Sequence, residues 1–285
     1  MSETRPLLPT GRFANILLAT ECSEFSRSAE ELSAALARLF SGRVTAMHML
    51  FSNPEYETLA PEQLQKQEIS ALQATNRVKQ WMEDQGVVCA VDIRRGVHPH
   101  QEIIDAAVDS DADLVVMGRR GRRGLARWMV GDATARVVAQ APCKVLVVPR
   151  GSVMWRTAIL LTTDGSRYSE RAGVVATILA ARSNLLLRVI SVVENKGNVA
   201  RLKLATEAVE RVVEHARAAG VEVSGEVVEG HPPVDVIARE AQQCGADLVV
   251  GGSHGRTGIE RVFLGSVMER LIGRVSCPVL AIKGG

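Results

Sequence analysis

The chain has 285 residues, with 34 Lys and Arg against 32 Asp and Glu, 46% apolar residues and five cysteines. At ~150 residues per domain, this length predicts two domains, each large enough to bury its own core. The net charge of +2 gives no electrostatic reason to expect nucleic acid or an anionic membrane as a partner, and the apolar content excludes a disordered chain. We therefore expect a soluble globular protein.

The cysteines are odd in number and widely scattered, and no C-x-x-C pair occurs among Cys22, Cys89, Cys143, Cys244 and Cys277. A disulfide framework or a zinc site needs paired or closely spaced cysteines, so these thiols are expected to be small buried apolar groups and no metal site is predicted. The first residues lack the order of a secretory signal, and no apolar run approaches the ~20 residues that span a bilayer. A cytoplasmic protein is expected.

An internal repeat organises the chain. Residues 96–99 recur as 230–233, residues 112–116 as 246–250 and residues 143–146 as 277–280, all at one offset. Residues 16–20 match residues 159–163 at a larger offset, because the segment around residues 51–60 has no counterpart after Ser191. The chain therefore contains two copies of one domain, residues 12–149 and 155–283, joined by a short linker.

Short apolar runs alternate with longer amphipathic patterns within each copy. In the second copy, in chain order, the pattern predicts a strand at residues 158–163, a helix at 166–182, a strand at 185–193, a helix at 199–219, a strand at 221–228, a helix at 234–242, a strand at 247–251, a helix at 267–272 and a strand at 279–282. Alternation of this kind, with Val- and Leu-rich strands, predicts a parallel α/β sheet covered by helices on both faces. Right-handed crossovers would wind each copy into a doubly wound domain.

A glycine-rich loop follows the strand at residues 247–251. Gly252 and Gly255 turn the chain, and Gly265 and Ser266 come nine residues later at the start of the next helix. Glycines let backbone N–H groups approach an anion, and a helix N-terminus leaves such donors unpaired, so two sets of donors can converge on one polyphosphate. Two structural interpretations stand beside this one: residues 266–269 form a capping box that serves only their own helix, and the glycines are turn residues.

The spacing Gly252-x2-Gly255-x9-Gly265-Ser266 resembles the ATP-binding signature of the universal stress protein family. The run at residues 162–166, Thr-Thr-Asp-Gly-Ser, resembles the family's first strand end, which carries an aspartate. The resemblance covers residues ~12–283 and both copies, as in a tandem member. It implies two doubly wound domains, each a five-stranded parallel sheet in the order 3-2-1-4-5, and binding of ATP or another adenine nucleotide, with or without Mg²⁺, where strands one and four diverge.

The resemblance also assigns roles to residues of the second copy. It implies that Thr162, Thr163 and Asp164 flank the adenosine, and that Val192 lines the adenine. Gly251 and Gly252 would pass close to the ribose and phosphates, while Gly255, Gly265, Ser266 and Val267 would hold phosphate through backbone N–H groups and the Ser266 hydroxyl. The family often has Pro in place of Thr162 and Thr or Ser in place of Met268, and neither change removes an essential backbone donor.

The first copy departs further from the signature. Its loop keeps the glycine spacing up to Gly131, but Asp132 follows, Glu21 replaces the strand-end aspartate and Met49 takes the adenine-lining position. Asp132 is able to cap its helix, yet a carboxylate touching a phosphate repels it by about 4 kcal/mol at an effective dielectric near 20. The arginines at 119, 120, 122 and 123 offset that charge, pair with Asp132 or form a solvated face. We expect one nucleotide per chain, held by the second copy.

These features favour an adenine-nucleotide-binding module for stress response or signalling. The alternatives are a ligand-free scaffold that acts through protein contacts and a slow ATP hydrolase. No catalytic residue is assigned. The glycine loop has no lysine beside it, and a histidine in a glycine turn, such as His254, is typically a solvated polar residue. The three tryptophans are too dispersed to stack nucleic acid bases, so no nucleic acid or membrane partner is expected.

The last strand of each copy, residues 145–148 and 279–282, is apolar and needs covering. Members of the family that this chain resembles commonly dimerise through that strand, which implies an intrachain pseudo-dimer of the two copies. A homodimer of the chain stays open as a further state.

Overall fold

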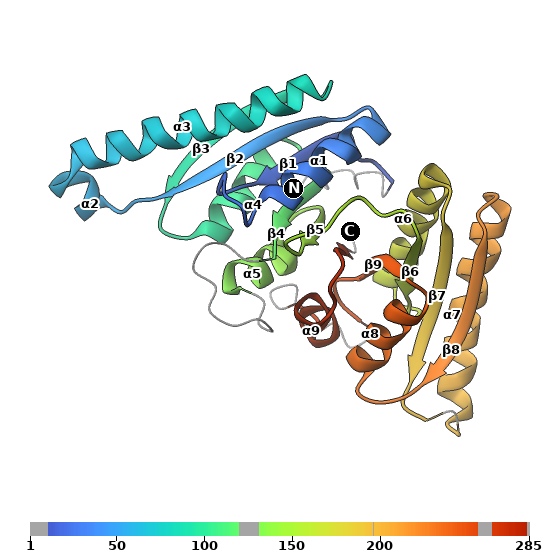
Figure 1. Cartoon of the computed structure of the whole chain (residues 1–285). Coiled ribbons are helices and arrows are strands. Elements are labelled where there is room, and N and C mark those ends of the chain that lie inside the picture. The colour runs from blue at the N-terminus through green and yellow to red at the C-terminus, as the bar shows by residue number, and fades with distance from the viewer. Residues whose placement is uncertain (1–10, 120–130, 196, 256–263, 284–285) are drawn as a thin grey trace, which may run out of the picture.

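Both halves of the chain alternate strands with helices in a computed structural model that describes residues 11–119, 131–195, 197–255 and 264–283 (Figure 1). The first half contains β1 (Asn15–Ala19), α1 (Arg27–Phe40), β2 (Arg43–Phe51), α2 (Pro54–Leu59), α3 (Pro61–Asp84), β3 (Cys89–Gly96), α4 (Pro99–Asp109), β4 (Leu114–Gly118), α5 (Asp132–Gln140) and β5 (Lys144–Val148). The second half contains β6 (Ala158–Thr162), α6 (Arg167–Ser183), β7 (Leu186–Val193), α7 (Val199–Ala218), β8 (Val223–Glu229), α8 (Pro233–Gln243), β9 (Ala246–Gly252), α9 (Ser266–Arg274) and β10 (Val279–Ile282).

All ten strands lie in one sheet, in the order β3-β2-β1-β4-β5-β10-β9-β6-β7-β8. Within each half the strands are parallel and follow the predicted order 3-2-1-4-5. The halves join where β5 and β10 pair antiparallel, with Leu280 opposite Leu146 and Val279 opposite Val147. The apolar last strands thus cover each other within the chain, as expected from the sequence.

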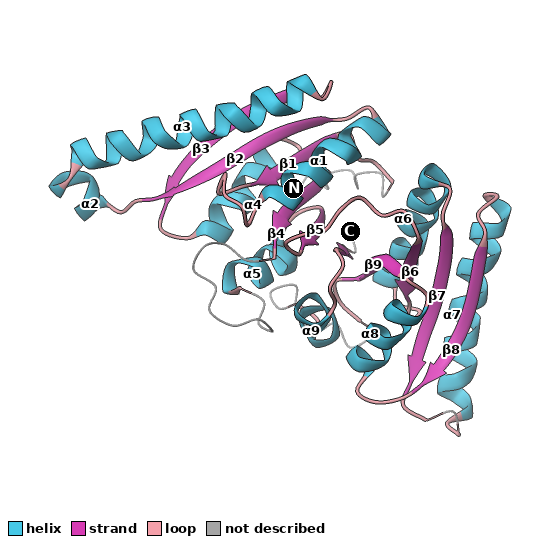
Figure 2. Cartoon of the chain, viewed as in Figure 1, coloured by secondary structure: helices cyan, strands magenta, loops and turns pink. Residues whose placement is uncertain are grey.

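Helices cover both faces of the sheet and create two apolar layers (Figure 2). Side chains alternate along each strand, so that Ile16 and Leu18 face the layer of α1, α3, α6 and α7, whereas Leu17 faces the layer of α4, α5, α8 and α9. This burial on both faces explains why the strands read as continuous Val and Leu runs.

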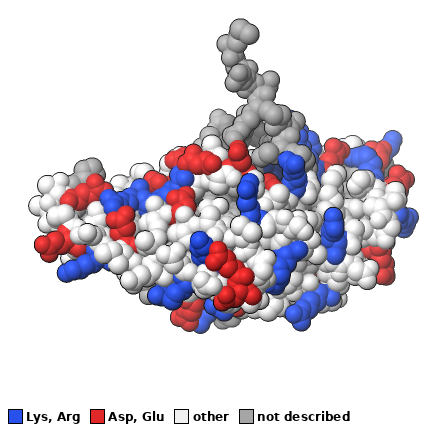
Figure 3. All heavy atoms as spheres, turned by 90° about the horizontal axis from the view of Figure 1, so that it is seen from above, with Lys and Arg blue, Asp and Glu red and all other residues white. Residues whose placement is uncertain are grey.

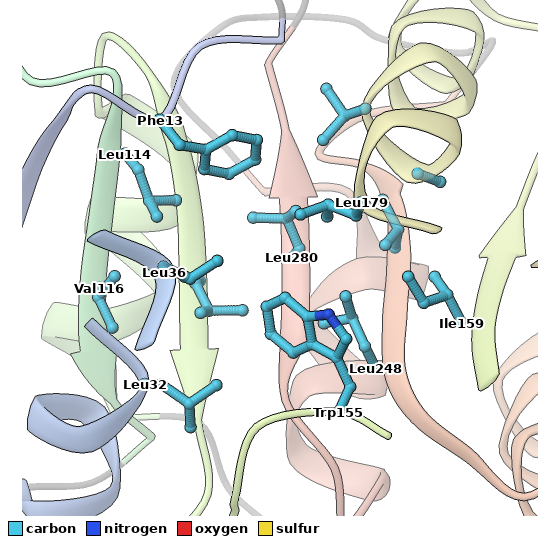
Figure 4. Close-up of a cluster of buried hydrophobic side chains, with 14 of the residues drawn as sticks. Phe13, Leu32, Leu36, Leu114, Val116, Trp155, Ile159, Leu179, Leu248 and Leu280 are labelled. Atoms are coloured by element: carbon cyan, nitrogen blue, oxygen red, sulfur yellow. The ribbon is translucent and has the colours of Figure 1, made fainter. Parts of the chain in front are cut away.

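The core continues from one half into the other. Phe13, Leu36, Trp155, Leu179 and Leu280 belong to a single buried cluster beside the central strands (Figure 4). The Trp155 side chain is 3% exposed, and its Nε1 donates to Ser183 Oγ at 3.2 Å. Because buried residues of both halves belong to this cluster, the two halves pack as one body.

Polar contacts also bridge the two halves. The Arg119 guanidinium of the first half donates to the carbonyls of Ile272, at 3.3 Å, and Val275, at 2.7 Å, where α9 ends. In the other direction, Lys283 Nζ donates to the carbonyl of Ala139 near the end of α5. Cations at helix C-termini are favourable there because the carbonyls carry partial negative charge.

On the face seen in Figure 3, basic and acidic side chains lie interspersed instead of gathering by sign. That distribution agrees with the net charge of +2. Within the described part of the chain, no helix combines the length and apolar character needed to cross a bilayer.

Candidate functional site

A cavity of about 250 Å³ opens beyond the carboxyl ends of β6 and β9. β6 lies between β7 and β9, and the chain leaves β6 for α6 on one face of the sheet and β9 for α9 on the other. Ligands of open α/β sheets bind at such a switch point, because the diverging loops leave a crevice there. The second half therefore holds a cavity at the place that its strand order predicts.

The structure brings most of the predicted site residues together. The cavity is lined by Thr162, Thr163, Asp164, Val192, Gly252, Gly255, Gly265, Ser266 and Val267. Gly251 lies beneath it instead, where a Cβ would stand 2.7 Å from Thr162 Oγ1 and 3.0 Å from Met268 Cε. Gly251 therefore lets β9 pack closely against β6 and α9.

The loop from β6 to α6 holds Asp164 in place. Asp164 Oδ1 accepts the Ser166 N–H at 3.0 Å, and the Thr163 hydroxyl accepts the Gly165 N–H at 3.3 Å. Gly165 has φ +75°, a left-handed conformation that favours glycine. Ser166 then caps α6 by accepting the Ser169 N–H at 3.3 Å. These bonds fix the Asp164 side chain at the cavity wall.

The glycine positions of this loop leave no room for a Cβ atom. A Cβ at Gly252 would stand 2.8 Å from Tyr168 Cβ, and one at Gly255 would stand 2.9 Å from Asp164 Oδ2. A Cβ at Gly265 would stand 3.0 Å from the Ser253 carbonyl oxygen. The loop therefore approaches Asp164 with bare backbone, which is the arrangement that exposes N–H groups to a ligand.

The start of α9 corrects the capping-box interpretation of residues 266–269. Gly265 is the N-cap residue, no side chain of the described residues caps the helix, and Ser266 is the exposed first residue of the helix. The Ser266 hydroxyl is thus not used as the cap of α9. Helix N-termini carry unpaired N–H groups, and here the first turn faces the cavity through Ser266 and Val267.

His254 is not the solvated residue that its glycine-rich surroundings predict. Its side chain is 8% exposed, its Nδ1 lies 3.0 Å from Ser253 Oγ, and its ring centroid lies 5.2 Å from that of Tyr168. The prediction failed because burial of this ring depends on Tyr168 in α6, which is remote in sequence. His254 acts as a packed wall of the cavity.

The apolar end of the cavity includes residues that the sequence analysis missed. They are Ile190 on β7, Pro233 and Ile237 on α8, and Met268 and Leu271 on α9. Ile190 shares a strand face with Val192, and this spacing of two residues is the signal that could have identified it. Pro233 belongs to the segment at residues 230–233 that repeats residues 96–99, and this repetition is its signal in the sequence.

The first half has a smaller cavity at the matching place, of about 180 Å³, lined by residues that include Thr20, Glu21, Met49 and Gly118. Asp132 does not cap α5: Gly131 is the N-cap residue, and Asp132 is 79% exposed and pairs with Arg136 at 3.0 Å. Arg119 does not offset Asp132 either, because its guanidinium contacts the end of α9. The arginines at 120, 122 and 123 lie outside the described residues.

In the described ranges, no group of three or more His, Cys, Asp or Glu side chains is arranged to hold a metal ion. Among the described residues, the polar groups around the cavity of the second half are the Asp164 carboxylate, the His254 imidazole, several hydroxyls and backbone amides. Such a donor set suits an organic ligand with hydroxyl and anionic groups.

Comparison with known proteins agrees with this geometry. A universal stress protein of Mycolicibacterium smegmatis is 29% identical over 289 residues, which cover 94% of this chain and 96% of that protein. One of Mycobacterium tuberculosis is 30% identical over 190 residues, and the match spans 63% of that relative, less than two thirds of its length. The crystal structure of a universal stress protein from Archaeoglobus fulgidus shares the fold, with a TM-score of 0.75, 22% identity, and coverage of 95% of this chain and 98% of that one.

The profile of the Universal stress protein family matches this chain twice, at residues 12–149 and 156–283. Together the two matches cover nearly the whole chain. The chain therefore belongs to the universal stress protein family, as a tandem of two family domains.

Proposed function

We propose that the second domain binds an adenine nucleotide, ATP above all, and that the chain is a nucleotide-binding module for stress response or signalling. The observation that carries this proposal is the convergence of Asp164, the bare glycine loop and the uncapped start of α9 on one cavity. Each group matches a different part of a nucleotide.

The flat base would lie at the apolar end, between Ile190 and Val192 on one side and Ile237 on the other. Asp164 would accept hydrogen bonds from the ribose hydroxyls, because a fixed carboxylate is a strong acceptor. The phosphates would lie against Gly255, Gly265 and Ser266, where Gly255 and the first turn of α9 would supply N–H groups. The Gly265 N–H itself donates to the Ser253 carbonyl at 3.0 Å, so Gly265 would contribute space instead of a donor. A Mg²⁺ ion would arrive with the phosphates, since this ion keeps several waters and needs few protein carboxylates.

The first domain is proposed to bind the same ligand much more weakly. Its cavity carries Glu21 in place of Asp164, and a side chain longer by one methylene would leave less space for a nucleoside. Asp132 stands at the first residue of α5, where the second domain has Ser266. A negative charge at that place repels phosphate.

Binding is favoured over hydrolysis by the surroundings of His254. A hydrolase needs a base that orients water beside the terminal phosphate. His254 is the histidine of the glycine loop, and its Nδ1 lies against Ser253 Oγ while its ring packs on Tyr168. We infer that this histidine shapes the cavity and that the chain holds nucleotide instead of turning it over.

The change Gly265→Val tests the site. The valine side chain would meet the Ser253 carbonyl and His254, and it would cover the N–H groups at the start of α9. Calorimetry should show ATP affinity reduced by a factor of about 100 or more, equivalent to about 2.7 kcal/mol.

Gly131→Val in the first domain is the matched control. Among the described residues, a Cβ at Gly131 would meet only Thr134 Oγ1, at 3.7 Å, so this variant should keep the affinity of the wild-type chain. Thermal unfolding of both variants checks that each remains folded. Equal ATP affinity for Gly265→Val and the wild type, or no ATP binding by the wild type, would overturn the assignment.

A further inference from the structure

A side chain of the first domain holds a helix of the second. Arg119 follows β4 directly, and its backbone N–H donates to the Val148 carbonyl of β5 at 2.8 Å. From there its side chain passes the β5–β10 pairing where the halves join, and its Nη1 donates to the carbonyls of Ile272 at 3.3 Å and Val275 at 2.7 Å. Both carbonyls belong to the end of α9. Figure 1 shows α9 between α5 and α8, in the same helical layer.

The other end of α9 faces the candidate nucleotide cavity. Ser266, Val267, Met268 and Leu271 line this cavity, and all four lie on α9. The helix has nine residues, so its two ends are about 13 Å apart. A tilt or shift at the end that Arg119 holds therefore moves the residues that line the cavity.

The helix α9 is weak by itself. Its nine residues are fewer than a helix needs to be stable in isolation. Gly273 lies in its last turn, where a glycine loses more backbone entropy on folding than any other residue. Among the described residues, no side chain caps the start of the helix. The position of α9 therefore depends on the contacts that other elements make with it.

The contacts at the end of α9 are of three kinds. Ile272 and Val275 are buried, but apolar contacts are not directional. Arg274 pairs with Asp235 of α8 at 3.1 Å, yet both side chains are about half exposed, and exposed ion pairs contribute little. The hydrogen bonds from Arg119 are directional, and a cation is favourable at a helix C-terminus. Among the described contacts, those of Arg119 are therefore the best suited to fix the direction of α9.

The repeat shows that this contact is not a general feature of the domain. Ser253 matches Arg119 in the second copy, and its hydroxyl lies 3.0 Å from His254 Nδ1. The matching helix of the first domain, α5, is held instead by Lys283, whose Nζ donates to the Ala139 carbonyl. Each of these two helices thus receives a cation from the other domain, but the two cations occupy different positions of the repeat.

A bond that only joins the two halves is the alternative role for Arg119. The halves are already joined by the β5–β10 pairing and by the buried cluster that contains Trp155 and Leu280. A joining role predicts lower stability when Arg119 is changed, with no specific effect on α9 or on the cavity. A role in the site predicts a change in both.

We propose that Arg119 is a positioning residue for the nucleotide site of the second domain. It is not among the described residues that line the cavity, and it acts through α9, whose first turn it holds toward the phosphates. The inference rests on the proposed function and extends it, because the site of the second domain is then complete only when the first domain supplies this contact. A first domain that binds nucleotide weakly is still needed for binding by the second.

The test removes the contact with Arg119→Met, which keeps an unbranched side chain but has no donor. Calorimetry on the full chain should show ATP affinity reduced about tenfold, the size expected when hydrogen bonds from a charged group are lost. Arg119→Lys keeps a cation with donors and should restore most of this affinity. Lys283→Met is the matched control, because it removes the cation that holds α5 instead of α9, and its ATP affinity should equal that of the wild type.

Hydrogen exchange on the ligand-free chain measures the effect on α9 without any nucleotide. The amides of residues 269–275 should exchange severalfold faster in Arg119→Met than in the wild type, because the end of the helix opens more often. In Lys283→Met these amides should exchange as in the wild type. Thermal unfolding checks that each variant remains folded.

Three results would overturn the positioning role: unchanged exchange in α9 of Arg119→Met, unchanged ATP affinity of that variant, or an equal loss of affinity in Lys283→Met. The absence of ATP binding by the wild type would overturn the proposed function and, with it, the role of Arg119 in the site. Faster exchange in α9 would still show, in that case, that Arg119 holds this helix.

Discussion

Single side chains set the two candidate nucleotide cavities apart. Asp164 and Ser266 of the second domain correspond to Glu21 and Asp132 of the first; Glu21 lines the first cavity, whereas Asp132 begins α5 and pairs with Arg136. Gly252, Gly255 and Gly265 of the second domain keep the ligand space open, because a Cβ at any of them would collide with a neighbouring atom. Identity at a few positions, on one shared backbone plan, therefore decides which domain is expected to hold a nucleotide.

The buried thiol of Cys143 leads to a prediction about how the free energy of unfolding depends on pH. Its side chain is 6% exposed, and burial raises the pKa of the thiol from its ordinary value of 9.0 to about 12. The fold favours the neutral thiol, so its contribution to stability is complete below pH 9 and is lost as the pH rises toward 12. The unfolding free energy of the wild type, relative to that of Cys143→Ala, should fall by about 1.4 kcal/mol per pH unit above 9.

Urea unfolding of both proteins at pH values on either side of 9 measures this difference. Titrating groups remote from Cys143 affect both proteins alike and cancel in the comparison. Parallel pH profiles for the wild type and Cys143→Ala would show that the buried thiol does not titrate as argued.

At the residue level, the sequence predicted which residues lie together where their positions depend on spacing along the chain. Asp164, Gly252 and Gly265 line one cavity because strand ends and helix starts of a parallel sheet meet at one edge. It failed for His254 and for Ile237, whose positions depend on contacts with other elements. Burial of a loop histidine against Tyr168 leaves no periodic signal in the sequence.

At the scale of elements, the apolar periodicity predicted strands and helices closely. The long helix expected at residues 199–219 is α7 (Val199–Ala218), and the last strand occupies the expected residues as β10 (Val279–Ile282). The helix expected at 234–242 extends one residue further at each end, as α8 (Pro233–Gln243). Proline fits the first turn of a helix, because the N–H group that it lacks would have no partner there. The apolar pattern alone does not show that Pro233 belongs to the helix.

The apolar periodicity did not predict how closely two neighbouring helices pack. α6 and α7 pack closely through Gly173, whereas α1 and α3 stand apart around Glu30 and enclose a cavity. Glu30 stands where the second pair of helices has Gly173, and this is one of several differences between the two pairs. Only the spatial arrangement shows which residue lies at the crossing.

The change Gly173→Leu tests the role of close packing between α6 and α7. The added side chain would push against Val212 and Leu161, and overpacking of this kind costs about 1–3 kcal/mol. Val174→Leu is the matched control, because the Val174 side chain on the same helix is 37% exposed and has room for one more carbon. Chemical denaturation should show a loss for Gly173→Leu and little change for the control; equal stabilities would contradict the packing argument.

At the scale of the whole molecule, the antiparallel pairing of β5 with β10 turns two domains into one ten-stranded sheet. The resemblance to the family, together with the repeat and the two apolar last strands, predicted this pairing. The sequence did not predict that Trp155, at the start of the second copy, joins the shared core or that Arg119 reaches the end of α9. Those contacts join residues that no local pattern relates, and they make Arg119, directly after β4 of the first domain, a support for the second.

This asymmetric assembly leads to the central claim, which is one adenine nucleotide per chain, held by the second domain. Calorimetric titration of the nucleotide-free chain with ATP tests it most directly. The account predicts a stoichiometry near one, which Gly265→Val abolishes and Gly131→Val leaves unchanged. Two sites of similar affinity, or no binding at all, would contradict it.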